Sequence, residues 1–145
     1  MAALRQAWFR LALFVEARLL PFRIGRRPIA DILALADGPV PAGLDGMSVS
    51  AIVRAVRRTT RRPWLMADRP CLRQGVLAYR SLRAAGFAPE LHFGVDRDSI
   101  AEPSLRAHCW VVVDGAIVLN PPDPRMVTVL RHGGPAAPAA VAALA

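Results

Sequence analysis

Residues 68–86 read Asp-Arg-Pro-Cys-Leu-Arg-Gln-Gly-Val-Leu-Ala-Tyr-Arg-Ser-Leu-Arg-Ala-Ala-Gly. A helix over residues 71–85 is predicted by apolar side chains at helical spacing, namely Leu72, Val76, Tyr79 and Leu82. Asp68 and Pro70 stand where cap and first-turn residues belong, and a glycine follows the last turn. Cys71 therefore lies in the first turn, where unpaired backbone N–H groups and the helix dipole stabilise a thiolate.

A small antiparallel sheet is predicted after this helix. Residues 91–95 have the composition of a strand, and residues 96–102 that of a polar loop. The segments 107–113 and 116–120 flank Asp114-Gly115, a dipeptide typical of the tight turn of a β-hairpin. Because helical segments precede the strands, the order of elements predicts an α+β fold.

The first predicted helix carries an apolar stripe that Pro21 ends: Leu4, Trp8, Leu11, Val15 and Leu19. Other apolar residues widen the stripe, namely Phe9, Leu13, Phe14 and Leu20. Such a helix is buried in its own domain or docked on a partner or a bilayer, and we expect burial in its own domain. Arg10, Glu16 and Arg18 interrupt the apolar run, which argues against a signal peptide or a membrane span.

Two further helices are predicted before the cysteine. A short one is expected around residues 29–35, followed by a loop over 37–43. The next one has Ser48 or Ser50 as its cap, Pro63 as its end, and a stripe of Val49, Ile52, Val53 and Val56. Its other side carries Arg54, Arg57 and Arg58, which form either a solvated basic face or a docking surface for an acidic peptide.

Length and composition limit the class of protein. With 145 residues, 54% of them hydrophobic, the chain is large enough for one domain with a core. We predict one domain over residues 1–132, with a helical part (1–62) and a catalytic core (63–132). A flexible tail of Ala, Gly and Pro is expected over residues 133–145.

Charge and cysteine content limit the class of protein further. The net charge of +8 comes from arginine alone and would attract nucleic acid, an anionic membrane or an acidic peptide, without selecting one of them. Only two cysteines occur, Cys71 and Cys109, which excludes a disulfide scaffold and a zinc site of paired cysteines, and predicts a cytoplasmic protein.

Cys71 and His108 have the chain order of a papain-like or transglutaminase-like nucleophile and base. The alternative is that Cys71 is a small buried side chain beside Leu72. A three-residue loop over 113–115 would place His108 opposite Asn120, whose side chain would then orient the imidazole. A two-residue turn would put the two residues on opposite faces, because a slip of one residue inverts the pattern.

Other candidates are weaker on position alone. Asp123 orients His108 only if the chain bends after two prolines. His92 is expected to be packed in a strand, His132 belongs to a loose carboxy-terminal region, and Cys109 faces the core. The arginine-rich segment lacks interleaved aromatic residues and a nucleic-acid-binding motif, so no nucleic-acid partner is expected.

Several short stretches of the sequence, which follow one another in the same order and with compatible spacing, resemble those of a known family. They are residues 71–79, Leu82, Gly86, 91–95 and 107–110, with 20–23, 53–58 and Pro63-Trp64 upstream. In these elements the chain resembles the bacterial lasso-peptide leader peptidases, the transglutaminase-like cysteine protease half of the lasso-peptide B protein. The resemblance extends over nearly the whole chain to Pro122. It implies a transglutaminase-like, papain-like fold in which Cys71, His108 and Asn120 act together without a cofactor.

The resemblance also implies a substrate and partners. Members remove the leader of a ribosomally made lasso precursor peptide, commonly after a leader whose penultimate residue is threonine, so that a separate ATP-using cyclase closes the macrolactam ring. The stand-alone form lacks the winged-helix leader-recognition domain, so a separate recognition protein is expected to deliver the leader. Association with a membrane is not expected.

Three positions depart from the family pattern. The family often has Ser or Ala where this chain has Gly75, Ala where it has Cys109, and Asp where it has Asn120. Asparagine can orient an imidazole but stabilises imidazolium less than a carboxylate does. A thiol peptidase is the function we expect, and a non-catalytic transglutaminase-like peptide-binding or scaffold protein is the alternative.

Overall fold

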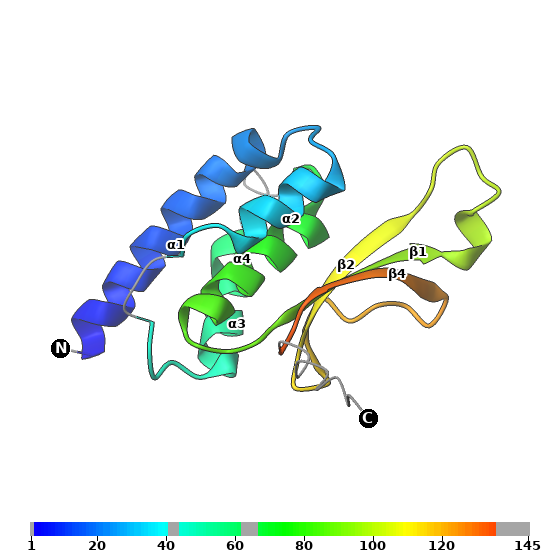
Figure 1. Cartoon of the computed structure of the whole chain (residues 1–145). Helices are drawn as coiled ribbons and strands as arrows, with labels where there is room; N and C mark the ends of the chain where they lie inside the picture. The colour runs from blue at the N-terminus through cyan, green and yellow to red at the C-terminus, as the bar shows by residue number, and fades with distance from the viewer. Residues whose placement is uncertain (1, 41–43, 62–66, 136–145) are drawn as a thin grey trace, which may run out of the picture.

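The computed structural model describes residues 2–40, 44–61 and 67–135 of the chain. Within them helices come first and strands follow, which confirms the predicted α+β class. The elements are α1 (Ala2–Ile24), α2 (Ile29–Asp37), α3 (Val49–Thr60), α4 (Pro70–Ala84), β1 (Glu90–Asp96), the 3₁₀ turn η2 (Arg97–Ser99), β2 (Ala107–Val113), β3 (Ala116–Leu119) and β4 (Met126–Gly133). The helices gather beside an antiparallel sheet of strand order β3-β2-β1-β4 (Figure 1).

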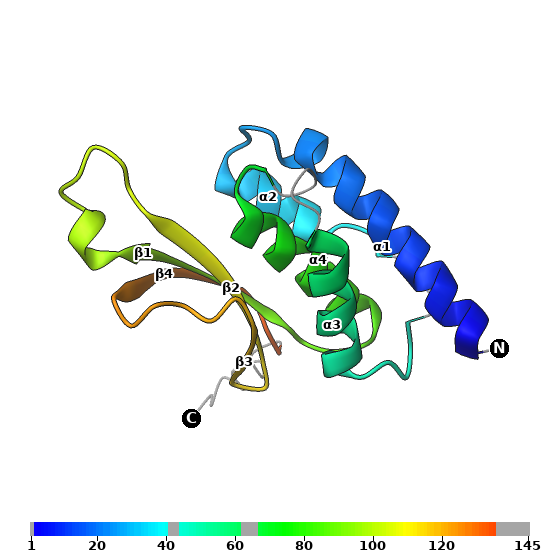
Figure 2. The same cartoon turned by 180° about the vertical axis from the view of Figure 1, so that it is seen from behind.

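Helix α4 connects the helical part to the sheet (Figure 2). It contacts α1, α2 and α3 as well as β1 and β2. The helix begins at Pro70, one residue before the predicted start, and its cap is Arg69 with a left-handed φ of 45° rather than Asp68. The guanidinium of Arg69 donates to the carbonyl of Gly25, which ties the start of α4 to the end of α1.

A buried arginine of α4 holds the helices together. Arg80 is 6% exposed, and its Nε donates to Glu16 Oε1 of α1 at 2.5 Å. Its two terminal nitrogens donate to the carbonyls of Leu35 and Pro39, at the end of α2 and just after it. A guanidinium can be buried here because oxygens of three segments satisfy its N–H groups.

Helix α1 is apolar on two sides, and it buries the one that the sequence analysis did not select. The buried side consists of Phe9, Leu13, Ala17, Leu20 and Ile24. The stripe that was expected to be buried is exposed: Leu4, Trp8, Leu11, Val15 and Leu19. The helix thus packs against its own domain as expected, but through the other side, because helical periodicity cannot tell which of two apolar sides meets the core.

Helix α1 also continues through Pro21, where the sequence analysis expected it to end. Proline removes its own N–H from the ladder, but the Gly25 N–H still donates to the Pro21 carbonyl at 2.9 Å. Leu20 and Ile24 on either side of Pro21 are each 1% exposed, so burial stabilises the extra turn. None of the described helices is long and apolar enough to cross a membrane.

The other helices follow the prediction closely. Helix α2 begins at Ile29 as expected and extends to Asp37. The side chain of Ser48 caps α3 by accepting from the Ala51 N–H at 3.3 Å. Helix α3 ends at Thr60, before Pro63, which lies outside the described residues together with Trp64.

Strands β2 and β3 form the predicted hairpin around a two-residue turn. Val113 pairs with Ala116, so Asp114 and Gly115 alone make the turn, with φ of 50° and 77°. Of the two alternatives the chain adopts the two-residue turn, because an aspartate followed by glycine tolerates the two positive φ angles of a tight turn.

A bulge in β3 restores the parity that the short turn would have inverted. Val112 pairs with Ile117, but Val111 pairs with Leu119, so Val118 is an extra residue on β3. Such an insertion moves the following side chains back to the other face of the sheet. Asn120, which follows Leu119, is therefore in position to meet residues near the start of β2.

Strand β4 was not predicted. It pairs with β1 and contains His132 and Gly133, which the sequence analysis assigned to a loose region and to a tail. As an edge strand it has half-buried and exposed side chains only, so its hydrophobic pattern is weak. The remaining tail residues 136–145 lie outside the described residues.

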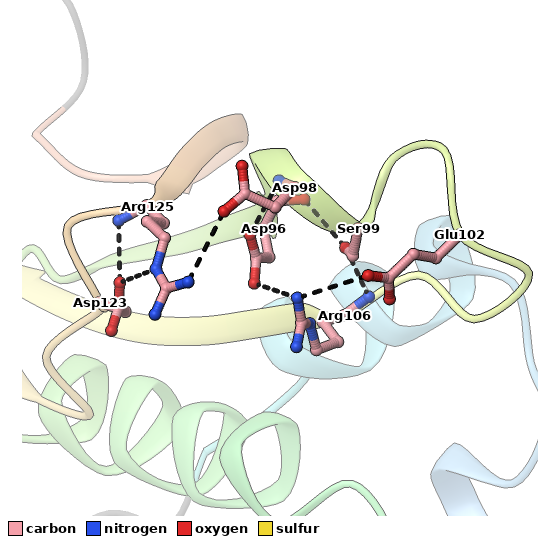
Figure 3. A network of polar contacts seen from close by, with 7 residues as sticks. All are labelled: Asp96, Asp98, Ser99, Glu102, Arg106, Asp123 and Arg125. Carbon is pink, nitrogen blue, oxygen red and sulfur yellow. Dashed lines mark hydrogen bonds and ion pairs between the residues drawn. The ribbon is translucent and has the colours of Figure 1, made fainter.

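A polar network fixes the far end of the sheet, where β1 turns toward β2 (Figure 3). The hydroxyl of Ser99, fully buried, donates to the Asp96 carbonyl at 2.9 Å and accepts from the Arg106 N–H at 3.0 Å. The Asp96 carboxylate accepts from the Asp98 N–H and pairs with Arg106 Nη2 at 3.0 Å. These bonds set the position at which β2 begins, directly before His108.

Helix α4 and the sheet approach each other closely at Gly75. A Cβ at this position would lie 2.7 Å from Cys109 Sγ of β2 and 3.1 Å from Leu91 Cδ1 of β1. The absence of a side chain at Gly75 therefore makes room for the sulfur of Cys109, and these are two of the three positions at which the chain departs from the family that it resembles.

Gly75→Ala is predicted to lower the free energy of unfolding by about 1–3 kcal/mol, since the added methyl overpacks the interface. In a Cys109→Ala background the same change should cost less, or stabilise, because alanine is the better helix former. Chemical denaturation of the four proteins measures this coupling. Equal effects of Gly75→Ala in both backgrounds would contradict the close contact.

Tyr79 joins α4 to the end of α2. Its hydroxyl donates to Asp37 Oδ1 at 3.0 Å, and the other carboxylate oxygen of Asp37 lies 2.9 Å from His132 Nε2 of β4. Burial, followed by the hydrogen bond to Asp37, raises the pKa of Tyr79 from 10.0 to about 12. The neutral phenol is thus the form that the folded protein favours.

Stability should therefore fall as the pH rises above 10, the ordinary pKa of tyrosine, and the loss should grow until about pH 12. Tyr79 is the single tyrosine, so tyrosinate absorbance reports it alone, and circular dichroism reports unfolding. Asp37→Asn should lower the pH at which tyrosinate appears. Full ionisation near pH 10 in a protein with native circular dichroism would contradict the burial of this hydroxyl.

Candidate active site

Cys71 and His108 lie on one pocket, which has a volume of about 260 Å³. Cys71 comes from the first turn of α4, and His108 is the second residue of β2. Phe93 of β1 and Ile29 and Ile32 of α2 supply apolar walls. The fold thus brings together the thiol and the imidazole that the sequence analysis selected, although 37 positions separate them (108 − 71).

The start of α4 offers backbone donors around the thiol. Cys71 is half-buried and follows Pro70. The hydrogen-bond ladder starts with the Arg73 N–H, which donates to the Arg69 carbonyl at 3.2 Å. The N–H groups of Cys71 and Leu72 precede this bond, so they are positioned to stabilise a thiolate or an oxyanion.

The environment of His108 determines its tautomer. Its Nε2 lies 3.0 Å from the backbone carbonyl oxygen of Asn120, and its ring stacks on Trp110 with 6.2 Å between centroids. A carbonyl only accepts, so Nε2 carries the proton and donates. Nδ1 of the neutral ring is then unprotonated and can accept a proton.

Asn120 orients His108 through its main chain rather than through its side chain. The side-chain Nδ2 donates to the Cys71 carbonyl at 3.3 Å. Asn120 has a left-handed φ of 54°, which asparagine tolerates better than most residues. One residue thus contacts both His108 and the start of α4, but not in the way that the sequence analysis predicted, because the bulge in β3 turns its carbonyl toward the ring.

The alternative candidates have other partners. Asp123 Oδ1 accepts from the Arg125 N–H at 2.9 Å, and this bond is the main reason that the pKa of its carboxyl is lowered. His92 Nε2 lies 2.7 Å from Glu90 Oε2, and His132 contacts Asp37. Asp114 stands at the tip of the hairpin turn. None of these contacts involves Cys71 or His108.

Cys109 is a core residue. It is 2% exposed, and burial, with the nearby Cys71 as a second cause, raises the pKa of its thiol well above the ordinary range. Both cysteines are free thiols. Of the two, only Cys71 is accessible enough to act as a nucleophile.

The pocket has a basic rim that the sequence analysis missed. Arg27, after α1, and Arg69, the cap of α4, both line it. The left-handed cap beside a helix-starting proline gives no clear pattern in sequence, and Arg27 is distant from Cys71 along the chain. In the described part of the chain, no group of three or more His, Cys, Asp or Glu residues could hold a metal ion.

The tautomer of His108 can be measured by nitrogen NMR of the histidine side chains. The geometry predicts a proton on Nε2 and a bare Nδ1 at a pH where the ring is neutral. Asn120→Gly should keep this tautomer, because it retains the carbonyl and adopts positive φ easily. A proton on Nδ1 in the native protein would contradict the assignment of Nδ1 as the acceptor.

Residues 9–132 match the family model described as the transglutaminase-like superfamily, and this stretch extends from Phe9 in α1 to His132 in β4. The chain matches no curated protein and no solved structure. Because the match covers most of the chain, the protein belongs to the transglutaminase-like superfamily.

Proposed function

We propose that the protein is a thiol peptidase with Cys71 as nucleophile and His108 as base. The observation that supports this most strongly is the hydrogen bond of His108 Nε2 to the Asn120 carbonyl, since it leaves Nδ1 free to accept a proton in the pocket that also contains Cys71. A histidine kept for packing alone would not need this tautomer beside a thiol at a helix start.

The reaction then follows from the geometry. His108 Nδ1 takes the thiol proton of Cys71, and the thiolate attacks the scissile carbonyl carbon. The N–H groups of Cys71 and Leu72 donate to the oxyanion. His108 returns the proton to the leaving amine, and water, deprotonated by His108, releases the acyl group from the sulfur.

We propose the leader of a ribosomally synthesised lasso precursor peptide as the substrate, on the basis of the resemblance described above. The basic rim of Arg27 and Arg69 suits a peptide with acidic groups near the cleaved bond. A separate leader-recognition protein would deliver the precursor, and a separate cyclase would use the freed amine. These partners, like a cytoplasmic location, are part of the proposal.

The test is reconstitution of the native protein with its recognition protein and precursor, with leader release followed by mass spectrometry. Cys71→Ala should abolish release, and His108→Ala should slow it by at least roughly 100-fold, because the base is lost. Asn120→Gly should retain activity within roughly tenfold, since the carbonyl that orients His108 remains. His132→Ala is the matched control, because this histidine lies on β4, contacts Asp37 of α2 and does not line the pocket, so its loss should not change the rate.

Leader release by Cys71→Ala at the native rate would disprove the assignment of the nucleophile. A native protein that binds the precursor and recognition protein without cleaving, and whose Cys71 is inert to alkylation, would instead support a non-catalytic scaffold.

A further inference from the structure

A second pocket lies between α1 and α3. It has a volume of about 370 Å³. Three arginines line it: Arg10 from α1, and Arg54 and Arg58 from α3. None of its lining residues is acidic, so the pocket is strongly cationic. It shares no residue with the pocket of Cys71 and His108.

The three guanidiniums are not used to hold the fold together. All three side chains are exposed, and within the described residues no ion pair or hydrogen bond involves them. Arg54 and Arg58 are four residues apart on one helix, where like charges repel each other. Three arginines with no carboxylate in one pocket therefore favour an anionic ligand.

The floor of the pocket is apolar. Phe9 is 3% exposed and belongs to the core, and Phe14 and Met47 are partly buried against it. A ligand that fills this pocket would place an apolar group on the floor and anionic groups at the arginines. A free phosphate would use the arginines and leave the floor uncovered, and a nucleic-acid backbone would call for a longer basic track.

We propose that this pocket binds a peptide segment in which carboxylate side chains flank an apolar side chain. The apolar side chain covers Phe9, Phe14 and Met47, and the carboxylates pair with Arg10, Arg54 and Arg58. Arginine suits this role because its planar guanidinium binds a carboxylate through two parallel hydrogen bonds.

The site is distinct from the candidate active site. Phe14, the last residue of α1 that lines this second pocket, lies ten helical steps before Ile24 at the end of α1, which is about 15 Å at the helical rise of 1.5 Å per residue, whereas the pocket of Cys71 is lined only by residues after α1. The proposal does not depend on the proposed peptidase activity, because binding can be measured without cleavage.

Fluorescence anisotropy at low ionic strength tests the proposal with a short fluorescein-labelled peptide of alternating Glu and Leu. The full chain should bind this peptide, and the double variant Arg54→Gln/Arg58→Gln should bind it at least roughly tenfold more weakly. Both arginines are exposed on α3, so the fold should persist, which circular dichroism checks.

Arg57→Gln is the matched control. Arg57 lies on the same helix, is exposed and carries the same charge, but it does not line the pocket. It should change the affinity by less than about twofold. An equal loss in Arg57→Gln and in the double variant would mean that net charge alone attracts the peptide, which would overturn the proposal.

Two further peptides test the chemistry of the ligand. Replacing Glu by Gln, or Leu by Ser, should weaken binding in each case, because each removes one of the two matched features. Equal binding of the Glu/Ser peptide would overturn the role of the apolar floor. Tighter binding of single-stranded DNA or of anionic lipid vesicles through Arg54 and Arg58 would overturn the choice of a peptide.

Discussion

The close contact between α4 and β2 is the constraint on which the candidate site depends. Cys109 Sγ lies only 2.7 Å from where a Cβ of Gly75 would be, so the helix and the strand approach more closely than a side chain at this position would allow. Cys71 lies one turn before Gly75, and His108 lies next to Cys109. The contact that packs the core therefore also brings the thiol to the imidazole. Arg80 and Tyr79 then fix α1 and α2 to α4.

Much of this arrangement follows from local sequence. Helical spacing predicted α3 and α4, a short helix was expected where α2 lies, and Asp114-Gly115 predicted the hairpin. Cys71 and His108 were selected because a thiol at a helix start and an imidazole at a strand start suit nucleophilic catalysis. The structure places both on one pocket, and the family match supports the fold.

The rest depended on tertiary contacts that no local pattern reveals. Helix α1 is apolar on two sides, and only the position of its neighbours decides that Phe9 and Leu13 are buried while Trp8 and Leu11 are exposed. Strand β4 covers an edge of the sheet without a fully buried side chain, and its residues Met126–Gly133 do not alternate between apolar and polar in sequence, although their exposure does. The bulge at Val118 lets the Asn120 carbonyl, not its amide, meet His108, and a bulge leaves no trace in the side-chain pattern.

The central claim is that the imidazole of His108 activates the thiol of Cys71. Its most direct test is the rate at which iodoacetamide alkylates Cys71 at neutral pH in the native protein, in His108→Ala and in His132→Ala, with the modified residue identified by mass spectrometry. The account predicts that Cys71 reacts and Cys109 does not, and that His108→Ala alone slows the reaction, by at least roughly tenfold. Equal rates in all three proteins would contradict it.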